Sequence, residues 1–262
     1  MMEKLKLALL GCGYLNEIVA DALLAGHLPE YELVGVFGRN EERVRAFADH
    51  YQCEGHTDIT SFMALKPDFV AEAASVQAVR DYSERILKGG SNLVVLSIGA
   101  FADAGLYESV RQTALESERK VYIASGAVGG FDILRTAALM SPITASISSQ
   151  KAPGSLRYSP LYREGLLDIT RRERVFEGTT KEAIAILPTH VNVAVATALA
   201  SAGPEQTRMN IDAVPGFQGD EYKIEIHGEE VHTDLNIYSR TSRIAAWSVV
   251  AVLQNAVSPI VF

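Results

Sequence analysis

The sequence holds few cysteines and fewer cations than anions, and each scarcity excludes a class of protein. Of its 262 residues only 2 are cysteines, Cys12 and Cys53, too few for a disulfide framework or for a zinc site built from several cysteines. Lys and Arg number 24 against 32 Asp and Glu, which gives a formal net charge of −8. This acidic balance disfavours a broad nucleic-acid or anionic-membrane interface. Any anionic ligand must therefore be held by local cations or by backbone N–H groups.

Targeting segments and uninterrupted long apolar runs are also missing. The chain enters a Gly-rich turn soon after its start, too early for the apolar core of a secretory signal. Residues 244–262 approach the length of a membrane span, but Gln254 and Pro259 interrupt them. A buried helix ending near Val257 explains this stretch better. We therefore expect a cytoplasmic protein with no membrane or nucleic-acid partner and no metal.

Strand-like and helical patterns alternate through the first 124 residues. Short runs rich in Val, Ile and Leu predict strands, and segments with apolar residues three and four positions apart predict helices. The predicted strands are 5–10, 32–37, 68–71, 93–96 and 121–124, and the predicted helices are 15–25, 41–50, 76–88 and 103–118. Such alternation without hairpin signals predicts a parallel sheet that binds its ligand at the carboxyl ends of the strands.

The rhythm changes after a glycine-dense turn at residues 125–130. The later patterns predict a helix over 131–140, strands over 143–150, 209–214 and 222–227, and a surface excursion over 151–174. We therefore predict an α/β fold with a Rossmann-type parallel sheet domain and a second α/β domain with a mixed or antiparallel sheet. The predicted domains are 1–124, which binds a dinucleotide and receives a C-terminal helix over 240–262, and 125–239.

The sequence Gly11-Cys12-Gly13-Tyr14-Leu15-Asn16 follows a predicted strand and opens a predicted helix. In that context a G-x-G pattern indicates a dinucleotide-binding turn. Gly11 allows the tight turn, Gly13 lets the backbone approach a pyrophosphate, and the helix N-terminus offers free N–H groups. The third glycine of the usual pattern is Asn16, so helix–strand packing must be adjusted there. The predicted cofactor contacts here are Gly11, Gly13, Tyr14, Leu15 and Asn16; the alternative is a strand–helix turn with incidental glycines.

Cofactor choice is usually decided at the end of the second strand, where an acidic residue binds the ribose hydroxyls of NAD. This sequence has Gly38 at that position and Arg39 beside it. A guanidinium can pair with the 2′-phosphate of NADP. The sequence therefore favours NADP over NAD. The alternative is that Arg39 is a solvated loop residue.

Five motifs recur in the order and spacing of one known family. They are residues 69–75 (FVAEAAS), 96–103 (LSIGAFAD), 125–132 (SGAVGGFD), 175–178 (VFEG) and 187–194 (LPTHVNVA). Through them the sequence resembles the L-aspartate dehydrogenase family over most of its length. The resemblance implies a Rossmann domain, a second domain that binds substrate and mediates dimerisation, and NAD(P)-dependent oxidation of an amino acid to its imine. In a biosynthetic setting, the iminoaspartate formed feeds nicotinamide nucleotide synthesis.

The resemblance also transfers cofactor contacts to particular positions. The family's contacts fall on Ala127, in the glycine-dense turn, and on Asn192, in the last motif. Ala74 and Ser97 lie in the first two motifs and are further predicted contacts. The glycine-dense turn also fits a plain domain crossover that needs positive φ angles, and the two interpretations are compatible.

The sequence departs from the family at the catalytic position. Where the family has Asp, Asn and the catalytic His, this chain has Val214, Asp220 and Tyr222. Histidine titrates near pH 6.5 and tyrosine near pH 10, so the substitution changes the available proton chemistry. Tyr222 could donate a proton in the reductive direction, act as a base beside a cation, or be a spectator.

Two histidines are candidates to replace the missing one. His190 takes a position where the family usually has Asn, two residues before Asn192, so we expect it near the nicotinamide. His227 lies five residues after Tyr222, which on a strand puts it on the opposite face. We therefore name Tyr222 and His190 as the catalytic candidates, with a purely structural role as the alternative for His190.

A carboxylate substrate requires at least one cation. Lys151 falls where the family has Lys-Pro-Pro, and it follows an apolar strand that would direct it toward the site. Arg240 and Thr241 precede the last predicted helix, whose N-terminal N–H groups could bind a second carboxylate. The alternative for Lys151 and Arg240 is surface charge.

These predictions combine into one function. We expect a homodimeric dehydrogenase that transfers hydride between a nicotinamide cofactor and the amine-bearing carbon of L-aspartate or a related amino acid. One alternative is a reductase of a different imine or oxo acid, which the altered catalytic motif permits. Another is a dinucleotide-binding dimer that has lost its catalytic His and does not turn over.

Overall fold

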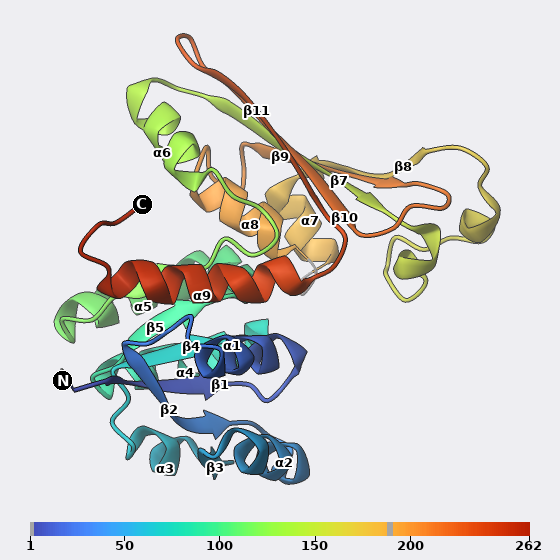
Figure 1. The fold of residues 1–262 in the computed structure, drawn as a ribbon. Helices are drawn as coiled ribbons and strands as arrows, with labels where there is room; N and C mark the ends of the chain where they lie inside the picture. Colours follow the sequence, from blue (N-terminus) through green and yellow to red (C-terminus); the bar gives the residue numbers. More distant parts are fainter. Residues whose placement is uncertain (1–2, 188–190) are drawn as a thin grey trace. The chain divides into compact units, whose positions relative to one another are not determined.

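The computed structural model describes residues 3–187 and 191–262. By its internal contacts the chain divides into two compact units, Met1–Gly126 with Ala245–Phe262, and Ala127–Ile244. The first unit contains a six-stranded sheet and the second a five-stranded sheet (Figure 1). The predicted α/β fold class, with one parallel and one mixed sheet, is confirmed.

The first unit is a parallel sheet in the order β3-β2-β1-β4-β5-β6. Its strands are β1 (Leu5–Leu10), β2 (Tyr31–Phe37), β3 (Glu54–His56), β4 (Phe69–Glu72), β5 (Asn92–Val95) and β6 (Val121–Ile123). Its helices are α1 (Tyr14–Leu24), α2 (Glu41–Tyr51), α3 (Ile59–Met63), α4 (Val76–Lys88), α5 (Ala104–Glu116) and α9 (Arg243–Val257), with a 3₁₀ turn, η1, at Ile98–Ala102.

Strand β1 is the topological switch point of this sheet. It pairs in parallel with β2 on one side and with β4 on the other, so the loops that follow these strands gather at one edge. Ligands of open α/β sheets bind in the crevice at such a point. An apolar cluster that includes Leu7, Val19, Phe69 and Val249 joins one face of the sheet to α1, α2 and α9. This packing holds the β1–α1 turn on a rigid base.

The second unit is a mixed sheet in the order β11-β10-β7-β9-β8. Only β7 and β9 pair in parallel, and the other pairs are antiparallel. Its strands are β7 (Thr144–Lys151), β8 (Glu173–Thr179), β9 (Thr207–Ala213), β10 (Asp220–His227) and β11 (His232–Ser239). Its helices are α6 (Phe131–Met140), α7 (Thr180–Ile186) and α8 (Asn192–Leu199), with 3₁₀ turns η2 (Pro153–Leu156) and η3 (Leu166–Asp168).

The two faces of this second sheet differ in polarity. Strand β10 alternates strictly, with Tyr222, Ile224 and Ile226 buried and the residues between them less buried, as expected for a half-buried strand. The segment predicted as a surface excursion, 151–174, buries Leu156 and Leu166 against Ala213. Most of its other residues are exposed or half-buried, so it is a surface excursion that a small apolar cluster anchors to β9.

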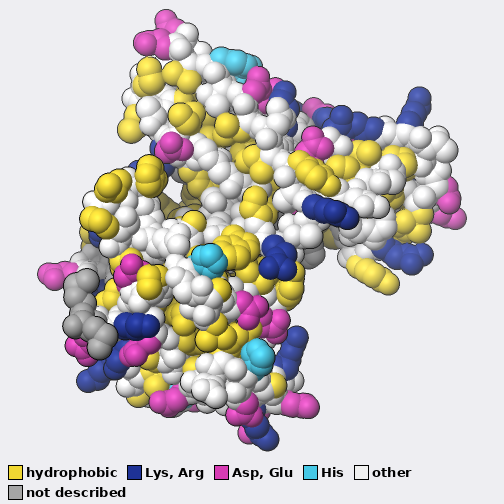
Figure 2. Space-filling view, in the orientation of Figure 1, with side chains coloured by type: hydrophobic (Ala, Val, Ile, Leu, Met, Phe, Trp, Pro, Cys, Tyr) yellow, Lys and Arg dark blue, Asp and Glu magenta, His cyan; other side chains and the backbone are white. Residues whose placement is uncertain are grey.

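On the face shown in Figure 2, cationic and anionic side chains of the described residues are interspersed. Within the described part of the chain, no helix combines the length and the apolarity needed to cross a bilayer.

Candidate functional site

The turn after β1 has the backbone geometry of an anion-binding turn. Gly11 adopts a φ of +110°, and a Cβ there would lie 3.0 Å from the Ala73 carbonyl oxygen and 3.0 Å from the Ala74 Cβ. Only glycine satisfies both the positive φ and this close approach. Gly13 is the N-cap of α1, and a Cβ there would meet no atom within 4 Å. The space beside the N-cap of α1 is therefore open, as the approach of a phosphate to a helix N-terminus requires.

Asn16 has a structural role that its place in the motif did not reveal. Its side chain is fully buried, and its Nδ2 donates to the carbonyl oxygens of Leu10, at 3.0 Å, and Gly11, at 2.8 Å. The amide thus joins α1 to the end of β1, where the third glycine of the usual motif would allow close packing. The Nδ2 group of Asn16 is thus used inside the protein, whereas its buried Oδ1 has no hydrogen-bond partner among the described residues.

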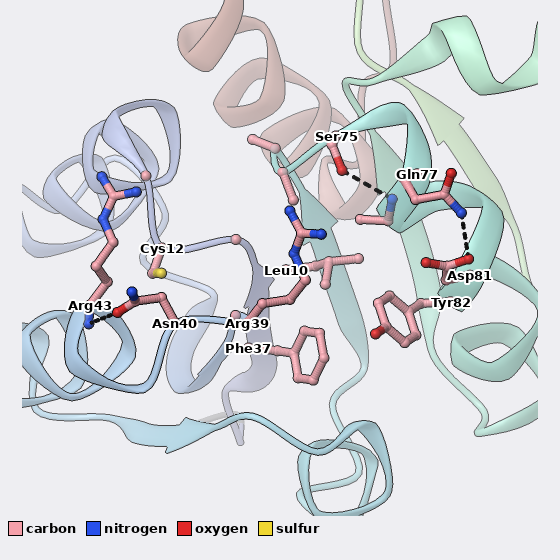
Figure 3. A pocket seen from close by; sticks show the side chains of 16 residues that line it. Leu10, Cys12, Phe37, Arg39, Asn40, Arg43, Ser75, Gln77, Asp81 and Tyr82 are labelled. Atoms are coloured by element: carbon pink, nitrogen blue, oxygen red, sulfur yellow. Dashed lines mark hydrogen bonds between the residues drawn. The ribbon is translucent and has the colours of Figure 1, made fainter. Parts of the chain in front are cut away.

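A pocket of about 270 Å³ opens beside this turn (Figure 3). This volume lies just below the usual range for small-molecule pockets, so it suits one part of a dinucleotide. Residues from the β1–α1 turn, the end of β2 and the start of α4 surround it. The lining includes Gly11, Cys12, Gly13, Phe37, Gly38, Arg39, Asn40, Arg43, Ala74, Ser75, Gln77 and Tyr82.

The end of β2 carries no acidic residue, and the space around Gly38 is crowded by side chains. A Cβ on Gly38 would lie 2.9 Å from the Cys12 Sγ and 2.9 Å from the Val44 Cγ2. A side chain at this position would therefore require the side chains of Cys12 and Val44 to move. Arg39 and Arg43 instead line the pocket and, in Figure 3, extend on either side of Cys12. Neither guanidinium forms an ion pair with any other residue that the structure describes.

Sequence reasoning found Arg39 but missed Arg43. The signal was available, because Asn40 caps α2 by accepting a hydrogen bond from the Arg43 backbone N–H at 2.9 Å. A capped helix start fixes the direction of the side chains in its first turn. Arg43 therefore points from the first turn of α2 to the same pocket that Arg39 lines.

Ala74 and Ser97 lie at the carboxyl ends of β4 and β5. Both are bonded to the side chain of Glu72, which accepts from the Ala74 N–H at 2.7 Å and from the Ser97 Oγ at 2.7 Å. Ala74 also lines the pocket. Sequence reasoning assigned no role to Glu72, although a glutamate within an apolar strand signals a buried polar contact.

In the second unit, the structure brings three residues of the altered catalytic motif together. Strands β7 and β10 are antiparallel, and the pairing of Gln150 with Glu221 puts Lys151 next to Asp220. The Lys151 Nζ lies 2.5 Å from the Asp220 Oδ1 and 3.3 Å from the Tyr222 hydroxyl. It also lies 5.3 Å from the centroid of the Tyr222 ring. We call these three residues the Lys–Asp–Tyr cluster.

The protonation states of this cluster follow from its burial and its charges. Burial raises the pKa of Tyr222 above its usual value, Lys151 opposes this, and Asp220 adds to it, so Tyr222 is a neutral phenol near pH 7. Burial lowers the pKa of Lys151, but Tyr222 and Asp220 outweigh this and raise it, so Lys151 is an ammonium. The phenol oxygen accepts from Lys151, which leaves its own proton to be donated.

The remaining predicted residues follow Gly126, begin α8 or precede α9. Arg240 and Thr241 are exposed ahead of α9, where the Thr241 Oγ1 accepts from the Arg243 N–H at 3.4 Å. Ala127 follows Gly126, whose φ is +66°. Asn192 is the first residue of α8.

The histidine candidates named from the sequence are His227 and His190. His227 is exposed at the end of β10, and its Nδ1 lies 2.8 Å from the His232 Nδ1, outside the Lys–Asp–Tyr cluster. His190 lies outside the described residues.

Comparisons with known proteins give concordant matches. Residues 132–256 match the family described as aspartate dehydrogenase, C-terminal, and residues 11–124 match the homoserine dehydrogenase, NAD binding domain. An L-aspartate dehydrogenase of Methanococcoides burtonii is 30% identical to this chain, and the alignment covers 98% of both sequences. An L-aspartate dehydrogenase of Archaeoglobus fulgidus is 31% identical, and the alignment covers 94% of this chain and 95% of the relative. The crystal structure of aspartate dehydrogenase from Thermotoga maritima is 25% identical, with a TM-score of 0.78 over 99% of this chain and 100% of that chain.

Proposed function

The chain belongs to the aspartate dehydrogenase family, and we propose that it is an NAD(P)-dependent oxidoreductase that interconverts L-aspartate, or a related amino acid, with its imine. The observation that carries the proposal is the open N-terminus of α1 behind Gly13, beside a pocket that two unpaired arginines line. A polyanionic dinucleotide is the ligand that such an arrangement suits in an acidic protein.

The residues of the first unit fit the nicotinamide cofactor. When bound, that cofactor supplies the hydride acceptor or donor for the reaction. The N–H groups of Tyr14 and Leu15 would hold the pyrophosphate at the start of α1, and Gly13 leaves the space for it. Asn16 keeps the turn in place through its bonds to Leu10 and Gly11.

We propose NADP as the preferred cofactor. Gly38 removes the acidic residue that would bind the ribose hydroxyls of NAD and repel a 2′-phosphate. Arg39 and Arg43 line the pocket next to it and have no carboxylate partner among the described residues, so both are available to a phosphate.

The Lys–Asp–Tyr cluster suits the proton and carboxylate chemistry of the substrate. We propose that the Tyr222 phenol donates a proton in the reductive direction, because it is neutral near pH 7 and its hydroxyl already accepts from Lys151. Lys151 orients a substrate carboxylate, which must share the ammonium with Asp220. Ala127, Asn192, His190, Arg240 and Thr241 remain proposed contacts on the strength of their positions in the family motifs.

The pairing of Lys151 with Asp220 favours a second candidate substrate. A cation already neutralised by a carboxylate at 2.5 Å attracts a dianionic substrate less than a free one would. The second candidate function is therefore reduction of an imine or oxo acid that carries less negative charge than the aspartate imine.

We further propose that the protein acts in the cytoplasm as a homodimer, with the first unit binding the dinucleotide and the second binding substrate and the partner copy. Both cysteines are free thiols, which is compatible with a reducing compartment. Analytical ultracentrifugation of the purified chain tests the dimer directly, and a monomer at micromolar concentration would overturn it.

The test of the function is a reductive amination panel. Oxidation of NADPH and NADH is followed with ammonia and a set of 2-oxo acids that includes oxaloacetate. We expect the highest rate with oxaloacetate and NADPH. A higher rate with a less anionic oxo acid would support the second candidate, and tight dinucleotide binding without turnover on any substrate would overturn the enzyme proposal.

A further inference from the structure

Glu72 is a buried carboxylate at the last position of β4. Its exposed fraction is 0%, and no cation of the described residues forms an ion pair with it. An unpaired buried charge is costly unless hydrogen bonds replace its hydration. The sequence therefore places a group whose burial is unfavourable at the carboxyl end of β4, next to the cofactor pocket.

Five hydrogen bonds replace the lost hydration of this carboxylate. Oε1 accepts from the N–H of Ala74 at 2.7 Å, the N–H of Ser75 at 3.0 Å and the Oγ of Ser97 at 2.7 Å. Oε2 accepts from the N–H of Leu96 at 3.2 Å and the N–H of Ser97 at 2.9 Å. Burial raises the pKa of Glu72, and the bonds to Ser97, Ala74 and Ser75 act against that rise.

All five donors come from two loops. The loop after β4 carries Ala74 and Ser75, and the loop after β5 begins at Leu96 and Ser97. The backbone ladder between β4 and β5 ends with the Leu96 N–H, which also donates to the Glu72 carbonyl oxygen at 3.2 Å, and the described residues show no backbone bond from Ala74 or Ser75 to the loop after β5. The Glu72 carboxylate makes that connection, so the two loops keep one spacing.

Of these two loops, only the one after β4 reaches the arginine-lined pocket; Leu96 and Ser97 lie one strand further along the sheet and do not line it. Ala74 and Ser75 line it, and the Ala73–Ala74 backbone is the segment against which a Cβ on Gly11 would collide. Arg39 follows β2, on one side of β1, and β4 and β5 lie on the other side. A dinucleotide with its pyrophosphate at the β1–α1 turn and its adenosine half near Arg39 would therefore place its nicotinamide half over β4 and β5.

From this geometry we propose that Glu72 is a positioning residue that fixes the β4 and β5 loops for the nicotinamide half of the dinucleotide. The inference rests on the proposed dinucleotide-binding function and deepens it. Glu72 acts through the backbone of Ala74, Ser75 and Ser97 and does not itself touch the cofactor.

The test separates the two halves of the ligand. Glu72→Gln keeps the shape of the side chain but turns an NH₂ group toward at least two of the backbone N–H donors, so the loops must move apart. We expect the Kd of NADPH to rise at least about tenfold, the equivalent of about 1.4 kcal/mol. The Kd of the adenosine half, 2′,5′-ADP, should rise by a clearly smaller factor, because Ala74 and Ser75 line its pocket whereas Leu96 and Ser97 do not. The same comparison is made with NADH and ADP. Fluorescence titration and calorimetry give the constants without any need for turnover.

Ser91→Ala is the matched control. Ser91 is also fully buried and donates through its Oγ to the Pro67 carbonyl oxygen at 2.5 Å. It directly precedes β5, at the amino ends of the strands, away from the cofactor pocket. It should lower stability while leaving both dissociation constants unchanged. Glu72→Asp, which keeps the charge and shortens the reach, should give an intermediate loss for the dinucleotide and serves if Glu72→Gln does not fold.

The outcomes are distinct. Equal loss of NADPH and 2′,5′-ADP, or no loss of either, in a folded Glu72 variant would overturn the positioning role and leave the proposed function intact. Failure of the wild-type protein to bind NADPH or NADH at all would overturn the proposed function, and the positioning role with it.

Discussion

A phenol stands where the family has an imidazole, and its surroundings decide what it can do. Tyr222 is 7% exposed, accepts a hydrogen bond from Lys151, and has its pKa raised chiefly by burial. A neutral phenol can give a proton but cannot take one near pH 7. The proposed role of Tyr222 is therefore that of a proton donor in imine reduction.

Substitution of Tyr222 tests this role. Tyr222→Phe should lower the turnover number by about 10²–10⁴-fold, the usual contribution of a positioned acid, with little change in the Kd of NADPH. Tyr238→Phe is the control, because Tyr238 lies on the neighbouring strand and its exposed hydroxyl bonds only to the Gln218 carbonyl oxygen among the described residues. Tyr222→His should raise aspartate oxidation; no rise at all would show that the assigned catalytic position is wrong.

The two pocket arginines make a second prediction at this scale. Arg39→Ala and Arg43→Ala should each weaken NADPH binding at least about tenfold and leave NADH binding within about twofold, because only NADPH carries the 2′-phosphate. Arg45→Ala is the control, since Arg45 is on the same helix but pairs with Glu41 at 3.3 Å and does not line the pocket. Equal losses for both cofactors, measured by fluorescence titration, would contradict the assignment.

At the scale of elements, periodicity predicted the buried strands and the long helices well. The patterns gave β1, α4 and α6 with the bounds that the structure has. The missed strands were β3, β8 and β11, all at sheet edges. An edge strand has one unpaired side in solvent and carries polar residues, so its sequence lacks the apolar signal of a central strand. In β11 every residue is at least partly exposed, which is why its alternation was not recognised.

Helix α1 supplies a prediction at the same scale. Asn16→Gly restores the glycine of the usual motif but removes two buried hydrogen bonds and adds a glycine to the helix. We expect a loss of about 2–3 kcal/mol in the free energy of unfolding, measured in urea. A variant as stable as the wild type would show that the Asn16 bonds to Leu10 and Gly11 contribute nothing net.

At the scale of the whole molecule, tyrosine hydroxyls and a cysteine thiol that are protonated in the folded protein link its stability to pH. Burial is the largest cause that raises the pKa of Tyr31, Tyr51 and Cys53, the last to about 11 from 9.0. Each folded pKa lies above its unfolded value, so the stabilisation is complete below the unfolded pKa and is lost as pH rises through the folded one.

Urea unfolding should therefore show a midpoint that falls from pH 8 to pH 10.5. Tyr31→Phe should reduce this alkaline loss, although it also removes the bond from the Tyr31 hydroxyl to the Leu253 carbonyl oxygen, at 2.8 Å, and lowers stability at pH 8. A midpoint that does not change with pH in the wild type would contradict the linkage.

The sequence by itself determined the parallel sheet, the mixed second sheet, the glycine turn and the family. These features depend on local periodicity and on short motifs, which lie within a few residues of one another. Only the tertiary structure decided that Lys151 joins Asp220 and Tyr222, that Arg43 lines the same pocket as Arg39, and that Glu72 fastens two loops. These contacts depend on strand register, on helix capping or on which strand ends lie next to each other. None of these produces a periodic pattern in the sequence, so the sequence alone could not predict the contacts.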